Sequence, residues 1–170
     1  MKKFVAAVVF CCAFPIPNPV HALDGVSLEY GVGTRAVNLW RLGLQWKGPP
    51  ADWMERRPQW SWYWDVSAGN WHGDEGTVHD FGVTPVLRWS KALPGPYLEG
   101  GIGLHILSDS HINSDLGFST RGQFGDHLGA GYHHGRYDWQ VRLQHLSNGG
   151  MRNPNPGINF MIFRLQYNLD

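Results

Sequence analysis

Apolar and polar residues alternate with a period of two along most of the chain. A clear case is the segment 137–144, where aromatic and aliphatic residues alternate with charged and amide residues. This period is that of a β-strand with two different faces. Eight such segments follow one another, and we predict strands at Val26 to Val32, Val37 to Trp46, Gln59 to Asn70, Thr77 to Trp89, Tyr97 to Leu107, Gln123 to His133, Tyr137 to Ser147 and Phe160 to Leu169.

The length and number of these segments predict the architecture. Each is about as long as a tilted strand that crosses a bilayer, and an even number is usual in bacterial single-chain barrels. We therefore expect an all-β protein, an eight-stranded antiparallel transmembrane barrel with its apolar face toward lipid. A soluble barrel with the apolar face inside, as in lipocalins, would give the same alternation and stays an alternative.

The N-terminus has the pattern of a secretory signal peptide. Lys2 and Lys3 precede an unbroken apolar run at 4–14, and small residues flank His21 at a suitable cleavage position. The run is too short to span a bilayer as a helix. We expect a signal peptide at 1–22 and one barrel domain at 23–170.

Removing the signal peptide changes the charge and the cysteine content. Lys2 and Lys3 leave, so 12 basic residues remain against 14 acidic ones, a net charge near −2. This balance gives no electrostatic basis for binding nucleic acid. Cys11 and Cys12 leave as well, so the exported domain has no disulfide and no thiol chemistry. A closed membrane barrel would supply the stability that disulfides provide in many small exported domains.

The connections between the strands indicate the orientation. If both termini are periplasmic, the polar loops 108–121 and 148–158 are external and the tight turn at 134–136 is periplasmic, in agreement with short inner turns and long outer loops. The connection from Lys47 to Pro58, in which we expect a helical turn around 53–57, is longer than this rule prefers.

The end of the seventh segment carries the candidate chemistry. His145 and Ser147 lie two residues apart, which places both on the apolar face with Cα atoms roughly 6.5 to 7 Å apart. The imidazole could reach the hydroxyl, as a general base must reach a serine nucleophile in ester hydrolysis. The N–H groups of Asn148, Gly149 and Gly150 follow as candidate oxyanion donors. A polar strand end before a turn is the simpler interpretation of the same residues.

The block His145-x-Ser147-Asn148-x-Gly150, followed by Asn155-Pro156-Gly157, resembles the lipid A 3-O-deacylase (PagL) family of outer-membrane barrels. The run from Phe124 to Gly131 is also similar to that family. The resemblance implies a Ser-His-acid triad on the outer barrel surface that hydrolyses an ester-linked acyl chain of lipid A without metal or cofactor. Ser147 would be the nucleophile, His145 the base and Asn155 a substrate-binding residue.

The third member of the triad departs from the family. The family's acid is a glutamate in its best-known form, and the matching position here is Asn159. An amide oxygen can accept the imidazole N–H and fix the tautomer, but it brings no charge to stabilise the imidazolium. Asp126, on the same face of the preceding strand, is the second candidate for orienting the histidine.

Other polar residues have structural interpretations. We expect interior ion pairs for a set of charged residues on the polar faces: Glu29, Asp65, Asp80, Glu99, Arg88 and Arg142. The histidines lack the HExxH pattern and cysteine partners, so we expect hydrogen-bonding or loop roles and no metal for His105, His111, His127, His133 and His134. Pro85 predicts a bulge or kink in the fourth strand.

The sequence thus favours an outer-membrane serine esterase acting on lipopolysaccharide, with outer-membrane lipids as surroundings. Alternatives are an outer-leaflet phospholipase, a non-catalytic structural or lipid-binding barrel, and a soluble ligand-binding barrel. The sequence leaves a homodimer open.

Overall fold

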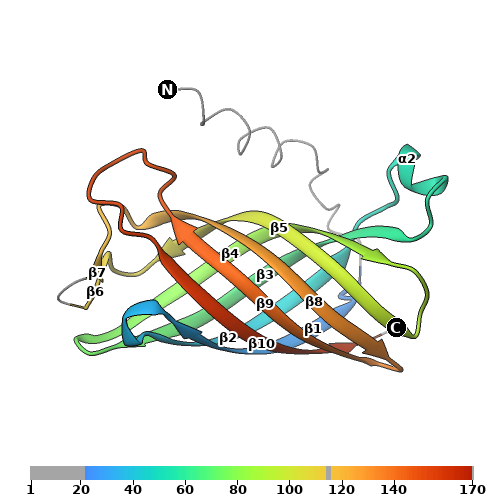
Figure 1. Ribbon diagram of the computed structural model, residues 1–170, viewed down its shortest axis with the longest axis horizontal. Helices are drawn as coiled ribbons and strands as arrows, with labels where there is room; N and C mark the ends of the chain where they lie inside the picture. Colours follow the sequence, from blue (N-terminus) through green and yellow to red (C-terminus); the bar gives the residue numbers. More distant parts are fainter. Residues whose placement is uncertain (1–21, 114–115, 170) are drawn as a thin grey trace.

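The computed structural model describes residues 22–113 and 116–169 and contains a closed eight-stranded barrel (Figure 1). Every strand is antiparallel to its neighbours, and β1 pairs with β10 to close the barrel. The strands are β1 (Gly25–Gly33), β2 (Asn38–Lys47), β3 (Trp60–Gly73), β4 (Gly76–Ser90), β5 (Gly95–Leu107), β8 (Gly122–His134), β9 (Tyr137–Ser147) and β10 (Ile158–Asn168). The prediction of eight strands is confirmed. The predicted signal peptide, with Cys11 and Cys12, lies outside the described residues except for Ala22.

The two faces of the strands decide between the alternative barrels. Leu128 is 73 % exposed and Leu42 is 65 % exposed on the outside, whereas Glu29 and Arg164 are each 1 % exposed inside. An apolar outside with a charged inside is the arrangement of a membrane barrel, and it excludes the soluble alternative with an apolar interior. No helix in the described residues is long and apolar enough to cross a membrane.

The barrel interior is filled by a network of ion pairs. Buried guanidinium and carboxylate groups from most of the strands meet there, so each charge has a partner. The pairs join Arg41 to Glu29 and Asp80, Arg88 to Glu99 and Asp138, Arg142 to Glu29, Asp65 and Glu99, and Arg164 to Glu29 and Asp65. The predicted interior ion pairs are confirmed.

An apolar cluster supports the end of the barrel where β9 ends. Ile112, Leu116 and Phe118, from the loop between β5 and β8, pack with Leu146 of β9 and Ile158 of β10. The loop contains a small hairpin of β6 (His111–Asn113) and β7 (Leu116–Gly117), where the sequence had predicted only a polar loop. This cluster gives the last residues of β9 and the first residues of β10 a fixed base.

The predicted helical turn in the connection between β2 and β3 is confirmed as α2 (Asp52–Glu55). It lies at the other end of the barrel from the β6–β7 hairpin (Figure 1). A short 3-10 helix, η1 (Thr34–Ala36), joins β1 to β2 at the hairpin end.

Of the bulge or kink predicted at Pro85, the bulge is wrong. Val83 pairs with Leu104 and Val86 pairs with Gly101, so the register between β4 and β5 continues without an inserted residue. Pro85 still pairs with Trp64 of β3. Because proline lacks an N–H group, it interrupts the ladder toward β5 alone.

Candidate active site

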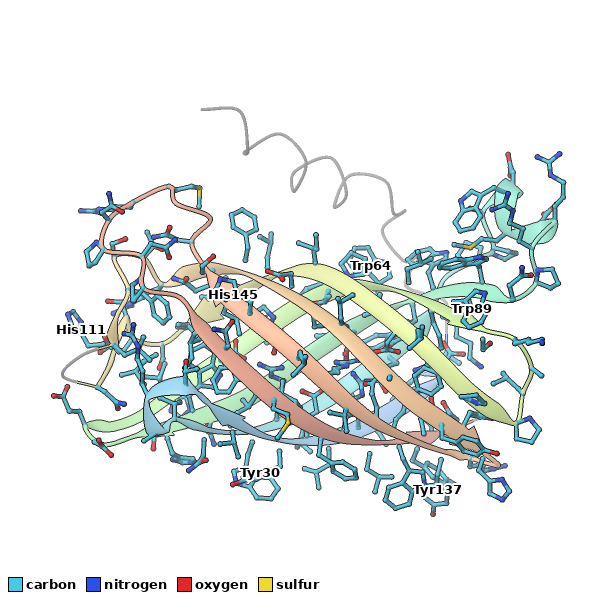
Figure 2. The ribbon with its side chains drawn as sticks, viewed as in Figure 1. Tyr30, Trp64, Trp89, His111, Tyr137 and His145 are labelled. Carbon is cyan, nitrogen blue, oxygen red and sulfur yellow. The ribbon has the colours of Figure 1, made fainter. Side chains whose placement is uncertain are left out.

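His145 and Asn159 face each other across the pair of strands β9 and β10. They are direct partners in the register, and His145 Nδ1 lies 2.8 Å from Asn159 Oδ1. Because an amide oxygen only accepts, the proton of the imidazole sits on Nδ1 in this contact. In the neutral imidazole this contact leaves the lone pair on Nε2, which is the tautomer that a general base facing the serine requires. Figure 2 shows His145 on the outer wall near the end of the barrel.

Ser147 follows His145 on the same outward face, as its alternating position predicted. Its hydroxyl oxygen accepts the N–H of Gly149 at 3.3 Å. Within the described residues, no direct hydrogen bond joins Ser147 to His145. Such contacts between nucleophile and base often tighten only when substrate is bound.

The two candidates for orienting the histidine differ in what they contact. Asp126 pairs with His145 in the register from the β8 side and is exposed. In the described part of the chain it forms no hydrogen bond to His145, whereas Asn159 does. The geometry therefore supports Asn159 as the residue that orients the imidazole.

The side chain of Asn148 is buried and organises the loop after Ser147. Its Nδ2 donates to Ser119 Oγ at 2.9 Å and to the Arg152 carbonyl at 2.7 Å, and its Oδ1 accepts the Gly150 N–H at 2.9 Å. The Asn148 N–H donates to Asn155 Oδ1 at 3.0 Å. Asn155 thus also holds the loop. Among the three predicted oxyanion donors, only the Gly149 N–H is directed at the Ser147 hydroxyl.

Gly157 lies against the imidazole, a contact that the sequence did not predict although Gly157 belongs to the Asn155-Pro156-Gly157 block. It adopts φ = +63°, and a Cβ built on it would lie 2.7 Å from His145 Cε1. The glycine backbone therefore packs directly against the imidazole, from the loop that joins β9 to β10. A turn residue with positive φ is usually glycine whether or not it contacts another group. The pattern Asn-Pro-Gly therefore predicts a turn but not the contact with His145.

Two shallow grooves on the outer wall meet beside this site. The first has a volume of about 600 Å³ and contains His145 and Asn159 with Leu143, Met161 and Thr34 along its walls. The second, of about 590 Å³, runs over β4, β5 and β8 and is almost entirely apolar. Asp126 and Leu128 line both grooves. An apolar chain held at the site could continue along the wall in either direction.

In the described part of the chain, no group of three or more His, Cys, Asp or Glu side chains is placed to hold a metal ion. The predicted histidines have other surroundings. His105 Nδ1 contacts Asp80 inside the barrel and His133 Nδ1 contacts Asp138. His127 is buried near Glu99, whereas His111 and His134 are exposed.

Comparison with known proteins gives a consistent result. The profile of the family described as "Lipid A 3-O-deacylase (PagL)" matches residues 38–168. The chain is 30 % identical to the lipid A deacylase PagL of Pseudomonas aeruginosa over 165 residues, covering 93 % of this chain and 94 % of the relative. It is 28 % identical to the lipid A deacylase PagL of Bordetella bronchiseptica, covering 96 % of this chain and 92 % of that protein.

Solved structures agree with the sequence comparisons. The crystal structure of the outer membrane enzyme PagL superimposes with a TM-score of 0.75 at 27 % identity, covering 84 % of this chain and 98 % of that one. A designed transmembrane β-barrel matches with a TM-score of 0.60 at 13 % identity, covering 86 % of this chain and 95 % of that one, and this likeness concerns the fold alone.

Proposed function

Because this chain belongs to the lipid A 3-O-deacylase (PagL) family, we propose that it is an outer-membrane esterase that removes the 3-O-linked acyl chain of lipid A. Ser147 is the proposed nucleophile and His145 the proposed base. Asn159 takes the orienting position. The observation that carries this assignment is the 2.8 Å contact between His145 Nδ1 and Asn159 Oδ1 on the outer wall, two residues before the serine.

The chemistry follows from the imidazole tautomer that this contact favours. Nε2 accepts the Ser147 proton as the hydroxyl oxygen attacks the ester carbonyl carbon, which gives a tetrahedral intermediate with a negative oxygen. The intermediate collapses, the bond to the sugar oxygen breaks, and the imidazolium returns its proton to that oxygen. A water molecule, deprotonated by His145 in the same way, then hydrolyses the acyl-serine ester.

The Gly149 N–H is the proposed donor to the negative oxygen, since the loop leaves it beside the serine. The Asn148 and Gly150 N–H groups already donate to side-chain oxygens within the loop. They could donate to the negative oxygen of the intermediate only after the loop rearranges. Asn159 has no charge. The imidazolium of the transition state therefore has less electrostatic support here than a glutamate would provide.

The position of the site favours a membrane lipid over a soluble ester. His145 and Ser147 face outward, at the end of a wall whose exposed side chains include Leu128, Leu143 and Met161. Two long loops, 108–121 and 148–157, are at this end, as is typical of the extracellular side, whereas two of the three connections at the other end are short turns. An acyl chain from the outer leaflet can lie along the apolar grooves while its ester reaches the serine.

Mass spectrometry of lipid A tests this proposal. Cells that produce the wild-type protein should contain lipid A lacking one 3-hydroxyacyl chain, and cells producing Ser147→Ala should not. Ser110→Ala, which changes a half-buried serine in another loop of the same barrel end, is the matched control and should behave as the wild type. If lipid A were unchanged and lysophospholipids, which have lost one acyl chain, accumulated instead, the proposal would be contradicted and a phospholipase would be favoured.

A further inference from the structure

The connection between β2 and β3 is unusually long for its end of the barrel. It spans residues 48–59, whereas the other two connections at that end, 91–94 and 135–136, are short turns. This end lies opposite His145, and in outer-membrane barrels the turns on the periplasmic side are normally short. A long connection there calls for a physical explanation.

The connection is folded and fixed to the barrel. Trp62 Nε1 donates to the Pro49 carbonyl at 2.7 Å, and the Gly48 N–H donates to the Trp62 carbonyl at 3.0 Å. The side chain of Met54, in α2, is only 3 % exposed. These contacts attach the connection to the barrel, and α2 projects away from the barrel wall (Figure 1).

The outer surface of this projection combines aromatic and basic side chains. Trp53 is 43 % exposed and packs edge to face against Trp60, with ring centroids 6.0 Å apart. Arg56 and Arg57 follow α2 directly and are exposed, and in the part of the chain that the structure describes neither guanidinium forms an ion pair. Counting Lys47, the three basic residues from 47 to 59 exceed the two acidic ones, Asp52 and Glu55.

The projection lies at the same end of the barrel as several aromatic residues of the wall. Figure 2 shows Trp89 and Tyr137 toward this end, and Trp60 and Trp89 both line the apolar groove of the outer wall. Tryptophan and tyrosine gather where hydrocarbon meets headgroups, and arginine binds phosphate through its planar donors. The surface is therefore continuous with the lipid-facing wall and carries the charge that attracts phospholipid phosphates.

We propose that α2 and the residues around it form a docking surface for anionic phospholipids of the periplasmic leaflet. Trp53 and Trp60 lie at the boundary of the acyl chains, and Arg56 and Arg57 contact the phosphates. The surface thereby fixes the depth of the barrel at the leaflet opposite the proposed active site. This inference does not depend on the deacylase activity, so the two can fail separately.

Native mass spectrometry of the full-length protein, released from nanodiscs of equal parts phosphatidylglycerol and phosphatidylethanolamine, tests the proposal. The ratio of retained phosphatidylglycerol to phosphatidylethanolamine should fall at least threefold in the double variant Arg56→Gln/Arg57→Gln. Lys91→Gln, which removes a basic residue from the short turn at the same end, should keep the wild-type ratio. Heat-modifiable migration on gels verifies that each variant is a folded barrel.

A second measurement uses Trp53 itself. In vesicles of phospholipid brominated near the headgroup, the wild type should lose more tryptophan fluorescence than Trp53→Phe does. An unchanged lipid ratio in the double arginine variant would overturn the proposal. If Trp53 also contributed nothing to the quenching, a periplasmic protein would become the favoured occupant of this surface.

Discussion

Asn159 gives the histidine a neutral partner at the position where the family's best-known form has a glutamate. Asn159→Ala removes the acceptor of the Nδ1 proton, and we expect kcat to fall about tenfold to a hundredfold because the tautomer is no longer fixed. Asn159→Glu should raise kcat by up to about tenfold, since a charged acceptor bonds more strongly to the imidazolium.

The pH profile separates these effects from a loss of structure. A carboxylate at position 159 favours the protonated imidazole, and the base works only when it is deprotonated. The acid limb of kcat/KM should therefore move to higher pH in Asn159→Glu. Asp126→Asn is the control, because Asp126 makes no hydrogen bond to His145 in the described residues, and its acid limb should stay in place. A shift in Asp126→Asn instead would make Asp126 the orienting residue.

Gly157 fixes the imidazole from the other side. In Gly157→Ala the new methyl group would overlap the ring, because the built Cβ lies only 2.7 Å from His145 Cε1. A displacement of about 1 Å can cost on the order of a hundredfold in rate, and we expect a loss of kcat of that size. Gly135→Ala, in the turn between β8 and β9, is the control. Gly135 has nearly the same backbone angle, φ = +60°, but a Cβ built on it would have no atom within 4 Å. The kcat of Gly135→Ala should match the wild type. Equal activities in both variants would show that the contact with the ring has no role.

At the scale of the elements, two loops hold each other in place beside the serine. Ser119, in the loop after β7, accepts Asn148 Nδ2 at 2.9 Å and donates to the Arg152 carbonyl at 2.9 Å, both in the loop after β9. Ser119→Ala removes these contacts, each worth about 1 kcal/mol, so we expect kcat to fall about threefold to tenfold. The barrel itself should unfold at the wild-type urea concentration. Ser110 lies before β6, in the same connection between β5 and β8, and Ser110→Ala should leave kcat unchanged. An equal loss in both variants would mean that the whole connection is merely loosened.

The strands were predictable because each one has two chemically different faces. Tyr137 to Ser147 was predicted with the bounds that the structure has, and the largest deviation is at the end of β3, which extends to Gly73 rather than Asn70. The alternation also placed His145 and Ser147 on the outer wall. The β6–β7 hairpin was missed because strands of three and two residues are too short to show a period.

Contacts between distant residues were beyond the sequence. The contact between His145 and Asn159 was expected only through the family resemblance and the shared face. The roles of Ser119 and Gly157 depend on how three loops meet above the apolar cluster, and no local pattern encodes that meeting. Pro85 shows that a local pattern can also mislead. A proline within a strand predicted a bulge or kink, but the pairing of β4 with β3 and with β5 keeps its register without a bulge.

At the scale of the whole molecule, the interior is a plug of charges rather than a pore. Arg142 is at its centre and contacts Glu29, Asp65, Glu99 and the Tyr63 hydroxyl, although it is only 4 % exposed. Strands far apart in the sequence are thereby joined across the barrel. The interior is thus occupied by charged side chains, and the outer wall carries the lipid-facing surface and the proposed site.

This arrangement makes the stability of the barrel depend on Arg142. Arg142→Ala removes one guanidinium partner from each of Glu29, Asp65 and Glu99 and leaves the buried network with one positive charge fewer. Breaking buried ion pairs from one side costs about 3–5 kcal/mol, so the urea midpoint in lipid vesicles should fall clearly. Val141→Ala, the neighbour that faces lipid and is 48 % exposed, should change the free energy of unfolding far less. If the two variants unfolded at the same urea concentration, water would have to solvate the carboxylates in the interior. A barrel hydrated to that extent should conduct ions across a planar bilayer, whereas a plug held by Arg142 should not.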